Sequence, residues 1–351
     1  MNRRFLNLVT ENLDTGLHSL RRLNLSSHLF CPSTAAAEAA MARSEAAIHA
    51  NAEREVGYKH GLRFLQTISS SLGTLPDAEI NLKPGCPYYT RELPFVVVTL
   101  LGDESKIFCS DCLGCTSLYD IDSCAVMTVP NLPIPISITR AAADGSPAGQ
   151  RDRLYIIDRH LHSDFGDDCF EELIYKRGQY FLSVKDMFNG WCSLPPPADE
   201  LRDIDAHTVV GDSTIYVSST TPSVGTYAFD TESWNWWHAG EWGLPFSGKA
   251  EYVPELNLWF GLSASRPFHL CAYDLSAVNF ERPPMVCHAW VDLDMPKSWS
   301  PLEMDLINLG SSRFCVVVRC NGEVSPPGKL RMLKNMSKYH VFEDHSIKCV
   351  L

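Results

Sequence analysis

The stretch TYAFDTESWNWWHAGEWGLPFSG (Thr226–Gly248) decides how the chain is interpreted, because it holds four of the eight tryptophans. The tryptophans could line a ligand site, or they could be the packing residues of one unit in a repeat protein. The opening stretch contains a segment that starts with apolar residues and ends in proline, WWHAGEWGLP (236–245). Similar segments occur elsewhere in the sequence, as VMTVPNLP (126–133), WCSLPPP (191–197) and WVDLDMP (290–296). This recurrence favours a structural repeat, with the tryptophan cluster on the outer strand of one unit.

Three stretches share the layout that precedes this outer strand: IFCSDCLGCTSLYDID (107–122), IYVSSTTPSVGTYAFD (215–230) and LWFGLSASRPFHLCAYD (258–274). Each has an apolar run, a turn-rich connection, a second apolar run and an Asp. This pattern predicts three β-hairpins, each followed by a turn.

The tryptophans at 191, 236 and 290 recur at about the 40 to 50 residue period of propeller blades. A further unit fits between the first two hairpins, with strands at ISIT (136–139), LYIID (154–158), FEELIY (170–175) and Trp191. The chain is therefore predicted to be all-β, a β-propeller of about six divergent blades.

The predicted organisation has three parts. Residues 1–30 contain a strand pair, FLNLV and LHSLRRL, that we expect to close the propeller by joining the C-terminal strands, because closure removes exposed sheet edges. A short N-terminal helix is the alternative for this part. Residues 31–92 are expected to form a helix, from the Ala- and Glu-rich run after Ser33, and a flexible linker. Residues 93–351 hold the blades.

Composition and charge argue against nucleic acid and membrane as partners and bear on the cellular compartment. The formal net charge is −12, which gives no general basic field for nucleic acid. No apolar run approaches the roughly 20 residues of a membrane-spanning helix. The thirteen cysteines are odd in number and scattered, which favours reduced thiols in the cytoplasm or nucleus. The chain is expected to be a monomer. An organelle transit peptide is the alternative for the Arg-rich start, although Glu11 and Asp14 interrupt it.

Several segments resemble a grass-plant family known as domain of unknown function 1668. They include MNRRFLNLV, SLRRLNLSSHLFCPSTAAAEAA, TYAFDTES and, most specifically, GEWGLPFSGKAEYVPELNLWFGLS (240–263). The resemblance covers nearly the whole chain. It implies a plant origin and a kelch-like β-propeller, and it carries no activity with it. The sequence departs from a kelch repeat at Ser218 and Ser219, which follow IYV where a kelch blade has a double glycine.

Candidate metal and acid–base residues have structural alternatives. Cys109, Cys112 and Cys115 have metal-like spacing, but a fourth ligand is lacking, so we expect no metal. His160 and His162 would point to one side of an extended segment, as a binding site could, although a solvated loop also explains them.

Two further features bear on binding. Asp167, Asp168, Glu171 and Glu172 form an acidic run that either attracts a basic partner or is a solvated face. Among the tryptophans, we expect Trp236 or Trp237 in the core and Trp234 exposed, as a candidate binding residue.

No local motif for a nucleophile or a nucleotide is present, so no catalytic residue and no cofactor are predicted. The expected function is non-catalytic binding of a partner protein through loops on a rigid ring. A substrate-recognition component of a ubiquitin ligase is one form of this function. The alternatives are a propeller enzyme, a hydrolase or an oxidase with its site at the central channel, and a degenerate member without a partner.

Overall fold

A computed structural model describes part of the chain in detail. The described residues are 5–12, 17–24, 77–82, 97–101, 106–110, 116–129, 135–141, 151–158, 169–176, 188–198, 200–211, 213–266, 268–290, 301–310, 313–320, 336–343 and 346–348. Their regular structure is β-strand throughout, and none of them lies in a helix. Accordingly, the described residues include no helix with the length and hydropathy needed to cross a membrane.

The chain divides into two compact units. Unit 1 comprises Met1–Lys83, Phe246–Asp274 and Met285–Leu351, and unit 2 comprises Pro84–Pro245 and Leu275–Pro284. Unit 2 contains the exposed aromatic residues of the candidate functional site.

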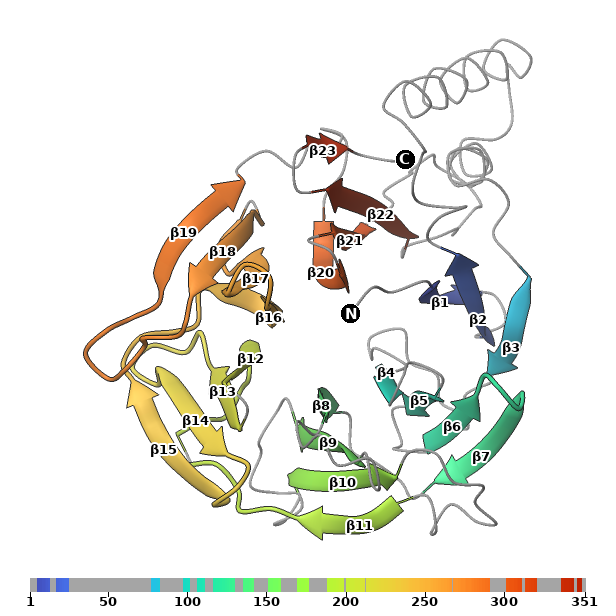
Figure 1. Cartoon of the computed structure of the whole chain (residues 1–351), viewed down its shortest axis with the longest axis horizontal. Helices are drawn as coiled ribbons and strands as arrows, with labels where there is room; N and C mark the ends of the chain where they lie inside the picture. Colours follow the sequence, from blue (N-terminus) through green and yellow to red (C-terminus); the bar gives the residue numbers. More distant parts are fainter. Residues whose placement is uncertain are drawn as a thin grey trace, which may run out of the picture. The chain divides into compact units, whose positions relative to one another are not determined.

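Unit 2 is built from antiparallel strands that pair in chain order, as Figure 1 shows. Its first group is β4 (Val97–Leu101), β5 (Lys106–Ser110), β6 (Thr116–Asp120) and β7 (Ala125–Val129). The second is β8 (Pro135–Ala141), β9 (Arg151–Asp158), β10 (Phe170–Lys176) and β11 (Phe188–Ser193). The third is β12 (Ala206–Val210), β13 (Thr214–Ser218), β14 (Thr226–Asp230) and β15 (Asn235–Gly240).

Unit 1 uses the same arrangement. Its strands are β1 (Phe5–Asn12), β2 (Leu17–Asn24) and β3 (Ala78–Leu82), then β16 (Phe246–Val253), β17 (Leu258–Ser263), β18 (Leu270–Asp274) and β19 (Met285–Trp290), and finally β20 (Pro301–Gly310), β21 (Arg313–Cys320), β22 (Met336–Glu343) and β23 (Ser346–Lys348). Within each of these three sets, consecutive strands pair antiparallel.

The three hairpins predicted from sequence are confirmed as β5–β6, β13–β14 and β17–β18. The further unit is also confirmed, since β8 to β11 pair in order. Both results follow from local pattern, because each pairing joins two apolar runs that are neighbours in the sequence.

The prediction for the N-terminal hairpin was only half right. The hairpin exists as β1 and β2, but β2 pairs with β3, and the C-terminal strands β20 to β23 pair with one another. The expected sharing of a sheet with the C-terminal strands is therefore wrong for the described strands. Within residues 31–92, the short run AEINL forms β3 rather than linker, and the predicted helix lies outside the described residues.

Each unit has its own apolar cluster. In unit 2 the cluster joins β9, β10, β13 and β14 through buried residues that include Tyr155, Phe170, Ile215 and Phe229. In unit 1 it joins β16, β17, β18, β20 and β21.

Strand β14 is covered on both faces. Ala228 and Phe229 are adjacent, so they point to opposite faces, and both are 0% exposed. A strand that is buried on both faces must be sandwiched by other elements, which distinguishes it from the half-solvated strand of an open antiparallel sheet.

Candidate functional site

Large exposed aromatic side chains gather around β15 in unit 2. Trp234 immediately precedes the strand and is 41% exposed, and Trp237 on the strand is 42% exposed. Phe280 is 56% exposed, and its ring meets the ring of His238 on β15 edge-to-face, with centroids 5.6 Å apart. We call Trp234, Trp237 and Phe280 the β15 surface. Strand β15 is terminal in its group, so no described strand of unit 2 pairs with its second edge (Figure 1).

Trp236 fixes β15 to the body of unit 2. Its ring lies 5.0 Å from the Phe229 ring and 5.4 Å from the Phe170 ring, centroid to centroid, and its indole Nε1 donates a 2.9 Å hydrogen bond to the Pro195 carbonyl. Trp236 is thus the packing tryptophan of the pair at 236 and 237, although it is only partly buried. Because side chains alternate along a strand, Trp236 and His238 share one face and Trp237 lies on the other.

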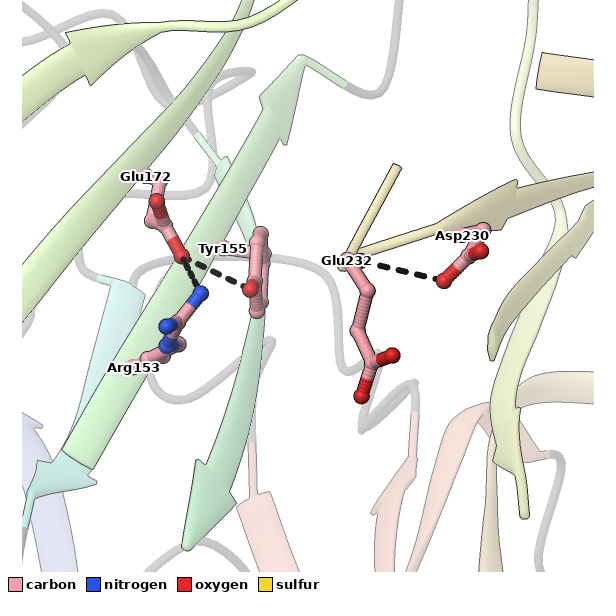
Figure 2. Close-up of polar contacts among 5 residues, drawn as sticks. All are labelled: Arg153, Tyr155, Glu172, Asp230 and Glu232. Atoms are coloured by element: carbon pink, nitrogen blue, oxygen red, sulfur yellow. Dashed lines mark hydrogen bonds and ion pairs between the residues drawn. The ribbon is translucent and has the colours of Figure 1, made fainter. Parts of the chain in front are cut away.

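A tight turn presents Trp234. The Asp230 carboxylate accepts hydrogen bonds from the Glu232 backbone N–H at 3.0 Å, drawn in Figure 2, and from the Ser233 hydroxyl at 2.9 Å. The Trp234 N–H closes the turn on the Asp230 carbonyl at 2.8 Å, and Trp234 takes a left-handed φ of 58°. The backbone N–H of Glu232 and the hydroxyl of Ser233 lower the pKa of Asp230, since they bond to its charged form.

The same turn occurs after β6. Asp120 accepts the Asp122 N–H at 3.0 Å, and Cys124 has a φ of 52° at the position equivalent to Trp234. Burial opposes ionisation of Asp120, but hydrogen bonds from Lys106, Ser123 and Asp122 together hold its pKa below the usual value. Asp120 and Asp230, the last residues of β6 and β14, therefore each order the turn that follows their hairpin.

Beyond β15, the chain is held by Trp242. Its Nε1 donates a 3.0 Å hydrogen bond to the Asn279 carbonyl, which connects the segment carrying Phe280 to this side of unit 2. The indole leaves no room at Gly240, where an added Cβ would lie 2.2 Å from Trp242 Nε1. The position of Phe280 is thus set by a glycine and a tryptophan that are distant from it in sequence.

A second polar feature lies between β9 and β10. Glu172 accepts a 2.7 Å hydrogen bond from the Tyr155 hydroxyl and forms a 3.0 Å ion pair with the Arg153 guanidinium (Figure 2). The Glu172 side chain is 2% exposed and that of Arg153 is 40% exposed. Burial, followed by the hydrogen bond to Glu172, raises the pKa of Tyr155 to about 12, so this phenol stays protonated at neutral pH.

This network corrects the sequence interpretation of the acidic run. Glu171 and Glu172 are 8% and 2% exposed, so they form neither a solvated face nor a patch that a basic partner could reach. Glu172 is buried because Tyr155, opposite it in the β9–β10 register, and Arg153 satisfy its charge. Asp167 and Asp168 lie outside the described residues.

The cysteines that the structure describes have the character of packing residues. Burial raises the pKa of the Cys109, Cys271 and Cys315 thiols to about 12, the opposite of the change that activates a nucleophile or a metal ligand. Cys112 and Cys115 lie outside the described residues, and the described residues contain no cluster of His, Cys, Asp and Glu suited to a metal ion.

Of the candidate binding residues Trp234, His160 and His162, the structure describes only the first. Trp234 belongs to the β15 surface, whereas His160 and His162 lie outside the described residues. Sequence reasoning missed Phe280, because it stands in a polar loop, ahead of Glu281 and Arg282, with no repeat signal.

The chain matches one known protein family over most of its length. Residues 3–342 match the family described as Protein of unknown function (DUF1668). The chain belongs to the DUF1668 family. No curated protein matches this DUF1668 chain.

Two solved structures from Bacteroides thetaiotaomicron VPI-5482 are similar to the DUF1668 chain at low identity. One is a structural genomics protein of unknown function, 11% identical with a TM-score of 0.39, matched over 66% of this chain and 56% of that chain. The other is an auxiliary nutrient binding protein, 12% identical with a TM-score of 0.40, matched over 70% of this chain and 56% of that chain. The DUF1668 chain therefore spans little more than half the length of either structure.

Proposed function

We propose that this DUF1668 chain is a non-catalytic protein-binding module, and that it recognises its partner through the β15 surface. The observation that carries the proposal is the exposure of three large aromatic side chains, Trp234, Trp237 and Phe280, around one terminal strand. A few residues supply most of the binding energy at protein interfaces, and Trp is enriched among them.

The proposed architecture is a kelch-like propeller in which the strand groups are blades. Repeated antiparallel groups in chain order support it, and so does the burial of adjacent residues on opposite faces, Ala228 with Phe229 and Leu118 with Tyr119. Blades that stack on both sides would bury both faces in this way. Such a rigid body loses little conformational entropy when a partner binds, which favours affinity.

The described side chains whose pKa changes most are poor candidates for catalytic nucleophiles. The large pKa changes fall on buried thiols and on Tyr155, and each raises the pKa, which keeps these groups protonated and unreactive at neutral pH. Thiols at Cys124 and Cys287, both exposed, fit a reducing compartment, and we place the protein in the cytoplasm or nucleus of a plant cell, as a monomer.

Affinity capture followed by reconstitution tests the function. The full chain, the Trp237→Ala/Phe280→Ala variant and the Met285→Ala/Val286→Ala variant serve as baits in plant extract, and captured proteins are then purified and titrated by calorimetry. The second variant is the matched control, since Met285 and Val286 are 72% and 56% exposed and lie on β19 in unit 1.

We expect a partner that binds wild type and the β19 control and binds the β15 variant at least about tenfold more weakly, the loss expected for interface aromatics. Equal melting temperatures for the three proteins establish that the fold is retained. Partners that bind all three proteins equally would place the interface elsewhere and overturn the proposal.

A further inference from the structure

The edge of β15 that no described strand pairs with has the features of a site for an added strand. Its side chains alternate across the edge, with Trp237 on one face and His238, covered in part by Phe280, on the other. A peptide paired to this edge would place its own alternate side chains against these two faces. Recognition by strand addition combines backbone hydrogen bonds with side-chain contacts at alternate positions in this manner.

The strand itself lacks the usual protection of a sheet edge. Asn235–Gly240 reads NWWHAG, without the Lys or Pro that commonly prevents edge-to-edge pairing. Its regular part is Asn235–His238, because the β14–β15 register shifts after that point. Four residues of regular edge are therefore available next to the exposed indoles.

The charged residues next to β15 along the chain are all acidic. From Asp230 to Gly248, which includes β15, the sequence has Asp230, Glu232 and Glu241 and no Lys or Arg. Glu232 and Glu241 are exposed and flank β15 at its two ends. Near Phe280, the exposed Glu281 and Arg282 offset each other. The edge therefore complements a cationic occupant.

We propose that β15 binds an extended peptide as an additional antiparallel or parallel strand, and that this peptide alternates basic and apolar residues. The basic side chains lie on the Trp237 face, where an indole attracts Arg or Lys and Glu232 and Glu241 add favourable charge. The apolar side chains lie on the Phe280 face. This specificity rests on the proposed function and names the class of partner segment that the β15 surface recognises.

A second copy of the chain is a poorer occupant of the same edge. Two β15 strands would bring together segments that both carry acidic residues and no Lys or Arg, and like charges across paired strands are destabilising. The occupant is accordingly a segment of a different, basic protein.

Four labelled decapeptides test the inference by fluorescence anisotropy with the full-length chain at physiological salt. The first alternates Arg and Val. The second replaces Arg by Glu, and the third has five Arg followed by five Val. The fourth keeps the alternating sequence but is N-methylated at every second peptide bond, on the edge that would face β15.

We expect the alternating Arg/Val peptide to bind at least about tenfold more tightly than the other three, which corresponds to about 1.4 kcal/mol. Trp237→Ala should weaken its binding about threefold or more, in the range of an indole–cation contact, while Met285→Ala on β19 leaves it unchanged. Equal affinity of the N-methylated peptide would exclude strand pairing, and equal affinity of the block peptide would reduce the interaction to net charge.

The outcomes separate this inference from the proposed function. If none of the peptides binds, or if Trp237→Ala abolishes a dimer seen in sedimentation equilibrium, the strand-addition inference is overturned. A folded partner that still depends on Trp237 and Phe280 would leave the proposed function standing in that case. If neither peptide binding nor partner binding depends on Trp237 and Phe280, both the strand-addition inference and the proposed function are overturned.

Discussion

Truncation of Trp236 separates the packing role of the tryptophan segment from its binding role. Trp236 is partly buried, and its indole contacts the rings of Phe170 and Phe229 while Nε1 is bonded to the Pro195 carbonyl. Trp237, the next residue on β15, is 42% exposed. The substitutions Trp236→Ala and Trp237→Ala therefore remove the same side chain from two different environments.

The magnitude follows from the contacts that are lost. Each of the two aromatic contacts is worth about 0.5–1.5 kcal/mol, and the hydrogen bond to Pro195 about 1 kcal/mol. We expect Trp236→Ala to lower the free energy of unfolding by about 2–4 kcal/mol, slightly less than the value for a fully buried aromatic. Trp236→Phe, which keeps a ring but loses the donor, should lose about 1 kcal/mol.

Urea unfolding followed by far-ultraviolet circular dichroism measures these differences without relying on tryptophan emission. Trp237→Ala is the matched control, and its effect should stay within about 0.5 kcal/mol, as for surface substitutions. Equal losses for Trp236→Ala and Trp237→Ala would show that β15 is not anchored through Trp236, and the assignment of Trp237 to a binding surface would lose its structural basis.

Three further predictions concern polar and glycine positions, each measured by urea unfolding. Arg153→Met leaves the 2% exposed Glu172 carboxylate without its cation and should lower the free energy of unfolding by about 3 kcal/mol. Glu172→Gln leaves a 40% exposed guanidinium that water can reach and should lower this free energy by about 1 kcal/mol. A larger loss for Glu172→Gln than for Arg153→Met would contradict the burial argument. Gly240→Ala forces the Trp242 indole to move and should lower the free energy by about 1–3 kcal/mol, while Gly243→Ala, whose Cβ would meet nothing within 4 Å, should have no effect. Because the folded-state pKa of Asp230 is lowered, the advantage of wild type over Asp230→Asn should be complete above about pH 4 and disappear as the pH falls through that folded-state pKa, and a pH-independent difference would contradict it.

The sequence predicted the parts of the fold that depend on neighbouring runs. The hairpins β5–β6, β13–β14 and β17–β18 follow from apolar runs and short turn-rich connections. In two of them an Asp at the end of the second strand, Asp120 or Asp230, accepts a backbone hydrogen bond that orders the next turn. These signals are local, so no knowledge of distant partners was needed. The same repeat predicted that Trp236 or Trp237 would pack, and the structure gives this role to Trp236.

The features that sequence reasoning missed depend on distant residues. Strand β3 is short and lies between Ser-, Gly- and Pro-containing segments, so its pairing with β2 had no periodic signal of its own. The burial of Glu172 depends on the β9–β10 register, which places it opposite Tyr155. Phe280 reaches β15 through the hydrogen bond of Trp242 to Asn279, a contact between loops that no repeat pattern encodes.

The backbone of Trp234 gives an independent reason to assign this residue to binding. A tryptophan at a φ of 58° is strained relative to glycine by about 1 kcal/mol, and the equivalent turn residue Cys124, at 52°, shares this strain. Trp234→Gly and Cys124→Gly should therefore each leave the free energy of unfolding unchanged or raise it by up to about 1 kcal/mol, since relief of strain is partly offset by the flexibility of glycine in the unfolded chain. Only Trp234→Gly should weaken binding of the alternating Arg/Val peptide, because only its side chain lies beside β15. A substitution that preserves stability and reduces affinity is the signature of a residue retained for recognition. If Trp234→Gly instead destabilises the protein by more than about 1 kcal/mol, or leaves the peptide affinity unchanged, then the indole packs rather than binds and the β15 surface must be reduced to Trp237 and Phe280.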